Sequence, residues 1–86
     1  FNGLFKLETL YLAYNSIKYM DSNSFILMKK LGELDLSNNR IVNLENKVFC
    51  GLDKLEKLLL NENQIKKLDS NLFLDLTSLK VLDISS

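Results

Sequence analysis

The segment Leu31-Gly32-Glu33-Leu34-Asp35-Leu36-Ser37-Asn38-Asn39-Arg40-Ile41 is written almost again at three other places in the 86-residue chain. The copies begin at Leu7, Leu55 and Leu79, so the four segments start at steps of 24 residues. A segment that recurs at a fixed period of about 20 to 50 residues indicates a repeat architecture. The chain should therefore fold as a row of similar units.

The period divides the chain into three complete units with partial units at both ends. The complete units are 7–30, 31–54 and 55–78, whereas 1–6 resembles the end of a unit and 79–86 the start of another. We expect one continuous domain, 1–86, taken from a longer array. Neither end carries a recognisable polar cap, which would leave core positions exposed. We therefore expect a marginally stable fold in isolation and end-to-end association.

Each unit begins with an alternating pattern and then changes its spacing. Leu34 and Leu36 alternate with polar residues, which predicts a short strand with both leucines directed inward. The other units repeat the pattern at Leu10 and Leu12, Leu58 and Leu60, and Leu82 and Ile84. The second half of a unit has too few periodic apolar positions for a long helix. There we expect irregular backbone, with a turn of 3₁₀- or α-helix near 25–29, 49–53 and 73–77.

The inward residues can be buried only if successive units stack. At the strand spacing of ~4.8 Å each apolar side chain would lie on its equivalent in the next unit. Phe25, Phe49 and Phe73 would form one such column. Burial of one Leu, Ile or Phe contributes roughly 1.5 to 3 kcal/mol, so these columns should stabilise the fold.

One polar residue recurs among the apolar ones, as Asn15, Asn39 and Asn63. A buried amide without partners costs roughly 1 to 3 kcal/mol. We expect each amide to pair with backbone groups left free where the strand turns, and with its neighbours in the stack, as a ladder. These three residues are therefore assigned a structural role.

Eight positions recur in register in all three complete units. In the second unit they are Leu31, Leu34, Leu36, Asn39, Ile41, Leu44, Phe49 and Leu52. This pattern resembles the typical leucine-rich repeat. The resemblance implies an α/β fold, a curved solenoid with a parallel β-sheet on its concave face and loops or short 3₁₀ or α turns on its convex face.

The 24-residue length and the central Phe are most similar to extracellular animal proteins such as Toll-like receptors, Slit and small leucine-rich proteoglycans. These families serve in innate immunity, cell adhesion and the matrix, and their curved array binds protein ligands or, in receptors, also microbial products. The resemblance therefore implies a protein-binding module located outside the cell or at its surface. Two alternatives stay open. The units could be structural spacers without ligand contact, or part of an intracellular scaffold or sensor.

The residues between the inward leucines face outward from the predicted sheet. The candidates for ligand contact are Tyr11, Tyr14, Glu33, Asp35, Lys57, Leu59, Glu62 and Asp83. The full outward set also contains Glu8, Glu56, Lys80 and uncharged residues such as Ser37, and its six acids and two bases give it a formal charge of −4 in a chain of zero net charge. This face suits a protein ligand of basic or mixed charge, with Tyr11, Tyr14 and Leu59 as apolar anchors. A sheet that merely faces solvent would carry similar polar residues.

Several other function classes are not expected. The chain has no His, so it cannot form a Ser-His-Asp, Cys-His or His-metal site, and its three glycines do not form a phosphate-binding loop. We therefore expect neither enzymatic activity nor a cofactor. Zero net charge argues against nucleic-acid binding. No apolar run reaches the ~18 to 20 residues of a membrane span, and the single Cys50 is interpreted as a small, partly buried hydrophobe.

Overall fold

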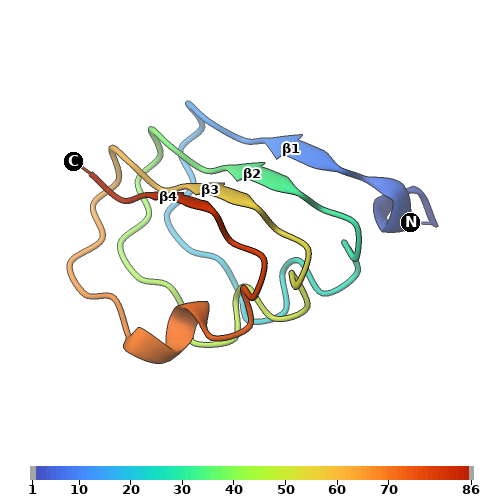
Figure 1. Cartoon of the computed structure of the whole chain (residues 1–86). Helices are drawn as coiled ribbons and strands as arrows, with labels where there is room; N and C mark the ends of the chain where they lie inside the picture. The colour runs from blue at the N-terminus through green and yellow to red at the C-terminus, as the bar shows by residue number, and fades with distance from the viewer. Residues whose placement is uncertain (1, 86) are drawn as a thin grey trace.

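A computed structural model describes residues 2–85. Phe1, which the period places in the Phe column, and Ser86, which it places on the outer side of the sheet, lie outside the described residues. The elements in chain order are η1 (Asn2–Lys6), β1 (Thr9–Tyr11), β2 (Glu33–Asp35), β3 (Lys57–Leu59), η2 (Ser70–Phe73) and β4 (Val81–Asp83). The chain winds through successive coils, with all strands on one side and loops on the other (Figure 1).

The strands form one parallel sheet in the order β1-β2-β3-β4. Leu10 pairs with Leu34, Leu34 with Leu58 and Leu58 with Leu82, a register of one 24-residue period per strand. Each strand has three residues, and further backbone hydrogen bonds extend the pairing past both strand ends. The N–H of Gly32 donates to the carbonyl of Glu8 at 2.8 Å. The predicted solenoid with a parallel sheet on one side is confirmed.

The inward side chains form a continuous core that is most complete in the middle of the stack. Leu34, Leu36 and Leu58 have no exposed surface, whereas Leu82 and Ile84 of the last coil are 39% and 48% exposed. The rings of Phe25, Phe49 and Phe73 stack as a column, with centroids 6.2 and 6.3 Å apart and planes inclined by 16° and 15°. Burial of an inward residue thus depends on having a coil on each side.

The side opposite the sheet is built of turns and one short helix, and the helical turn begins earlier than the sequence predicts. We expected a helical turn near 73–77, but η2 spans Ser70–Phe73 and therefore ends at the aromatic residue. Asp69 caps it, because its carboxylate accepts the Asn71 N–H at 2.8 Å. In the two preceding coils the corresponding backbone, 22–27 and 46–51, forms turns and no helix. The cap supplies the physical reason, since it fixes the start of the helical turn before Phe73.

Two of the recurring asparagines, Asn39 and Asn63, bind the backbone of two coils at once, whereas Asn15 is exposed and bonds only within its own coil. The Asn39 amide nitrogen donates to the carbonyls of Leu36 (3.0 Å) and Ser37 (3.1 Å) in its own coil and of Leu12 (2.9 Å) in the preceding coil. Its oxygen accepts the N–H of Ile17, also in the preceding coil, at 3.2 Å. Asn63 repeats these contacts one coil later. The expected ladder therefore runs through backbone groups, and the amide side chains do not bond one another.

Candidate functional site

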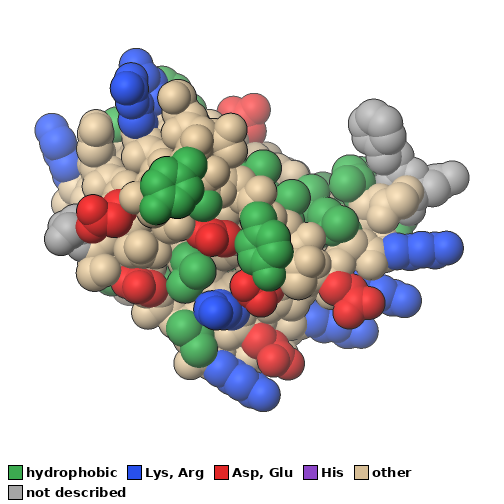
Figure 2. All heavy atoms as spheres, turned by 90° about the horizontal axis from the view of Figure 1, so that it is seen from above, with side chains coloured by type: hydrophobic (Ala, Val, Ile, Leu, Met, Phe, Trp, Pro, Cys, Tyr) green, Lys and Arg blue, Asp and Glu red, His purple; other side chains and the backbone are tan. Residues whose placement is uncertain are grey.

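The outer side of the sheet presents the side chains that alternate with the buried leucines. We call this surface the sheet face, and it comprises Thr9, Tyr11, Glu33, Asp35, Lys57, Leu59, Val81 and Asp83. Figure 2 looks onto this side and shows acidic side chains spread around exposed hydrophobic ones, with lysines or arginines mostly toward the margins. Six of these eight residues are among the predicted contacts, and the strands hold them on one rigid surface.

Tyr11 is the most exposed large residue of the strands, with 63% of its surface accessible. It pairs with Asp35 across β1 and β2, and Glu33 lies at the neighbouring position of β2. Side-chain hydrogen bonding to Glu33 and the negative charge of Glu33 raise the pKa of Tyr11, with further contributions from desolvation and from Asp35. The phenol therefore keeps its proton to a higher pH than an isolated tyrosine does.

Two aspartates on the sheet face are oriented by the serine two residues later. The Asp35 carboxylate accepts hydrogen bonds from the N–H (3.0 Å) and the hydroxyl (2.6 Å) of Ser37. Asp83 accepts the same pair of bonds from Ser85, and these backbone and side-chain hydrogen bonds lower the pKa of Asp83. Ser37 was expected to face outward, but it is only 6% exposed. Ser85 makes the same bonds in the last coil and is exposed, so the burial of Ser37 comes from the coils on both sides of it. In the middle of the stack this position therefore offers little to a ligand.

The strands end in a turn whose backbone the sequence analysis missed. Tyr14, Asn38 and Glu62 occupy the same position of their coils, and all three adopt left-handed backbone with φ of 59°, 55° and 59°. Asn tolerates this conformation, whereas most other residues lose roughly 1 to 2 kcal/mol in it. The Asn at position 38 is the sequence signal that could have revealed the turn. Tyr14 is nevertheless 81% exposed, so the strained residue gains almost no burial in return.

The structure brings the predicted contacts together in two groups. Tyr11, Glu33, Asp35, Lys57, Leu59 and Asp83 lie on the strands themselves. Tyr14 and Glu62 lie beyond the strand ends and two coils apart. Glu33 and Lys57 are register partners, yet the one ion pair within residues 2–85 joins Lys80 to Glu56 at 3.7 Å. The carboxylates of the sheet strands are therefore not neutralised by ion pairs within the described part of the chain.

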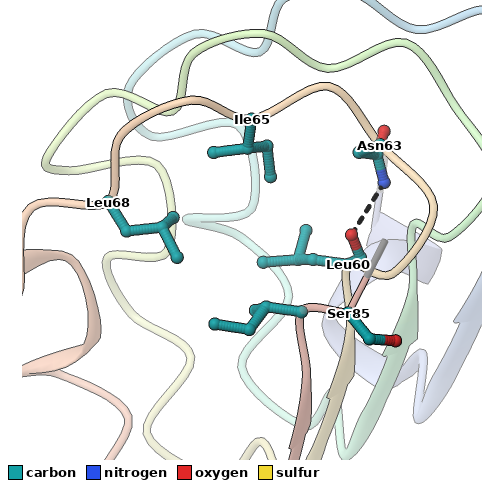
Figure 3. A pocket seen from close by; sticks show the side chains of 6 residues that line it. Leu60, Asn63, Ile65, Leu68 and Ser85 are labelled. Atoms are coloured by element: carbon teal, nitrogen blue, oxygen red, sulfur yellow. Dashed lines mark hydrogen bonds between the residues drawn. The ribbon is translucent and has the colours of Figure 1, made fainter.

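A partly open cavity of about 60 Å³ lies at the C-terminal end of the stack, between the third coil and the segment after β4. Leu60, Ile65 and Leu68 point toward it, and the Asn63 amide donates to the Leu60 carbonyl at its edge (Figure 3). Pockets for small ligands usually enclose about 300 to 1,000 Å³. This cavity is a gap in the core columns and is too small for such a ligand. Within residues 2–85 no cluster of metal-ligating side chains is found, and no helix is long and apolar enough to cross a membrane.

The stacked coils, the Asn ladder and the polar sheet face define a solenoid repeat protein that presents one rigid surface. The model of the protein family described as leucine rich repeat matches residues 1–41 and 29–86. The chain belongs to the leucine-rich repeat family. The resemblance inferred from the eight recurring positions is thus confirmed, and domains of this family generally serve as protein-interaction scaffolds.

Solved structures share this fold. The leucine-rich repeat domain of APL1B is similar over all of this chain, with a TM-score of 0.88 and 24% identity, and this chain covers 27% of it. TLR13, solved in complex with the single-stranded RNA ssRNA13, is similar over 90% of this chain, with a TM-score of 0.82 and 29% identity. This chain covers 11% of that structure. The curated proteins include no significant sequence match.

Proposed function

We propose that this chain is a protein-binding module whose sheet face takes a protein ligand of basic or mixed charge. The observation that carries the proposal is the exposure of Tyr11 (63%) beside the carboxylates of Glu33 and Asp35, with a second exposed tyrosine, Tyr14 (81%), beyond the end of the same strand. Exposed tyrosines on a rigid surface are frequent anchors in interfaces, because they bury a large area at little entropic cost. The adjacent carboxylates favour a ligand that carries lysine or arginine.

The backbone of Tyr14 supports the same proposal. A tyrosine in the left-handed conformation costs stability, and this one is not compensated by burial. Backbone strain of this kind concentrates at functional positions, where another requirement outweighs stability. Contact with a ligand is a requirement that an exposed aromatic side chain can meet.

The proposed location is outside the cell or at its surface, in a receptor, adhesion or matrix protein. The 24-residue repeat with its central Phe supports this location through the resemblance to extracellular animal families. An intracellular scaffold is the alternative location. The TLR13 structure contains RNA, so the zero net charge of this chain is a weak argument against nucleic acid. We retain protein as the proposed ligand because the strands of the sheet face carry more acids than bases.

The size of the sheet face limits the expected affinity. Four strands extend over roughly 15 Å, counted as three gaps of ~4.8 Å. A standard interface takes about 800 Å² from each partner, which is more than this surface readily supplies. We expect the 86-residue chain to bind with a Kd well above the nanomolar range, and a longer array to bind better.

A peptide selection tests the proposal. Peptides of 12 residues are selected from a random phage-displayed library on the folded chain, and the Kd of each is measured for wild type, Tyr11→Ala and Tyr19→Ala. Tyr19 is a matched control, because it is 72% exposed but lies in the loop between β1 and β2, outside the sheet face. We expect Tyr11→Ala to weaken binding by about tenfold or more, as for an aromatic hot spot, and Tyr19→Ala to change little. Equal effects of the two variants would favour the spacer alternative.

A further inference from the structure

A shallow depression lies at the edge of the sheet face where the strands begin. It is lined by Glu8, Thr9, Lys30, Gly32, Glu33, Lys54 and Glu56. Thr9 and Glu33 are the first residues of β1 and β2, so the depression is continuous with the sheet face. Its floor is fixed, because Gly32 donates to the Glu8 carbonyl at 2.8 Å and accepts the N–H of Glu56 at 2.9 Å.

The depression exists because one coil has a glycine where its neighbours have long side chains. The positions equivalent to Gly32 hold Glu8, Glu56 and Lys80. Gly32 does not have left-handed backbone, and a Cβ added to it would meet nothing closer than the Glu8 carbonyl oxygen at 3.7 Å. Gly51 differs on both counts, with φ of 91° and the Lys29 amine 3.3 Å from an added Cβ. The backbone at position 51 therefore favours a glycine, whereas the glycine at position 32 relieves no strain and leaves space.

The charges around this space favour a cation. Three carboxylates and two amines line it, which gives the lining a formal charge of −1. Glu56 lies 3.7 Å from the Lys80 amine, but both side chains are more than half exposed, so this ion pair is weak. Within the described residues neither Glu8 nor Glu33 forms a salt bridge, although Lys57 is the register partner of Glu33. Lys30 and Lys54 lie three residues before the first residues of β2 and β3, on the side away from the centre of the sheet. Along the backbone, Glu8 and Glu33 therefore lie nearer the centre of the sheet than the two lysines do, which favours their contact with a cationic group that enters from the sheet face.

We infer that the depression over Gly32 is a subsite for a lysine or arginine side chain of the protein ligand, held by Glu8 and Glu33. The inference rests on the proposed function and adds a position that determines specificity. A ligand chain lying across the strands would place an apolar or aromatic group against Tyr11 and its cationic side chain over Gly32. Charge-assisted hydrogen bonds to carboxylates are the strong ones, and a guanidinium can form two in parallel.

Filling the depression tests the inference. Gly32→Gln adds a neutral side chain at a position without strain or crowding, so the variant should keep the stability of the wild type. Gly3→Gln is the matched control, since Gly3 has nothing within 4 Å and lies in η1 before the sheet. The probes are the 12-residue peptides selected on wild type, each with its Lys and Arg residues replaced singly by Ala. Thermal unfolding of both variants confirms that they fold.

We expect Gly32→Gln to weaken peptide binding by about tenfold, whereas Gly3→Gln changes it by less than about twofold. Replacing one cationic residue of the peptide should cost about tenfold on wild type and almost nothing more on Gly32→Gln, because the two changes remove the same contact. The inference is overturned if Gly32→Gln binds like wild type, or if the coupled peptide residue is an acid, which would assign the depression to Lys30 and Lys54. The inference is also overturned if Gly32→Gln loses binding but no single Lys or Arg replacement in the peptide is coupled to it. If Tyr11→Ala has no effect on any peptide, the proposed function fails and this inference fails with it.

Discussion

Leu58 and Leu59 are leucines at adjacent positions of β3, but they face opposite sides of the sheet. Leu58 is completely buried between its equivalents Leu34 and Leu82, whereas Leu59 lies half-buried on the sheet face. The inner column holds an apolar residue in every coil, because each one packs on the next. The outer column reads Tyr11, Asp35, Leu59 and Asp83. The fold thus depends on one side of the sheet and leaves the chemistry of the other side free for a ligand.

The largest expected effect distinguishes these two leucines. Leu58→Ala should lower the free energy of unfolding by about 2 to 5 kcal/mol, because it leaves a cavity in the core. Leu59→Ala should lower it by less than about 1 kcal/mol, since the side chain already contacts solvent. Chemical denaturation followed by circular dichroism measures both values. Equal losses would mean that the outer side contributes to the fold as much as the inner side.

A smaller difference in stability is expected between substitutions of the same residue type in two coils. Asn39 is 6% exposed and binds the backbone of two coils, whereas Asn15 is exposed and donates within its own coil to Leu12 and Ala13. Asn39→Ala should destabilise by about 1 to 3 kcal/mol, because it leaves buried backbone groups without partners. Asn15→Ala should cost only a few tenths of a kcal/mol, because water replaces its bonds. Denaturation of the two variants under one condition gives the difference, and similar values would contradict the ladder.

The third prediction has the opposite sign. Tyr14→Asn should raise the free energy of unfolding by about 0.5 to 1 kcal/mol, because Asn tolerates the left-handed backbone at this position. The same change should weaken binding of selected peptides, since it removes an exposed aromatic anchor. The melting temperature and the peptide Kd should therefore both increase. A variant that is more stable and binds equally well would show that Tyr14 is not held there by a ligand.

The smallest effect concerns a proton on the sheet face. Glu33→Gln should lower the pKa of Tyr11 toward its ordinary value near 10, because Glu33 is the main cause of the raised value. In the wild type the folded state keeps the Tyr11 proton to a higher pH than the unfolded state does. Stability should therefore fall as the pH rises through the unfolded value near 10, and this dependence should shrink in Glu33→Gln. Absorbance titration measures the Tyr11 pKa, with Tyr11→Phe to identify its signal. An unchanged pKa in Glu33→Gln would mean that Glu33 does not interact with Tyr11.

The sequence predicted the structural features that recur with the 24-residue period, but not those that depend on the residues of one coil. The strands, the inward leucines and the asparagine positions follow from the 24-residue period, because equivalent residues meet equivalent neighbours in a stack. The start of η2 depends on Asp69, whose counterparts Asp21 and Glu45 form no such cap. The bonds from Ser37 to Asp35 need a Ser two residues after an Asp, a pair that the coils with Tyr11 and Leu59 at the equivalent position lack. The depression over Gly32 arises from one missing side chain, which no periodic pattern reveals.

The most direct test of the account maps a bound peptide on the molecule. Amide chemical shifts of the isotope-labelled chain are recorded while a selected 12-residue peptide is added. We predict that the largest changes fall at residues 8–14, 32–38 and 56–62, which form the strands and the turns that follow them. Changes concentrated at residues 21–27, 45–51 and 69–76, on the side opposite the sheet, would contradict the claim that the sheet face binds the ligand.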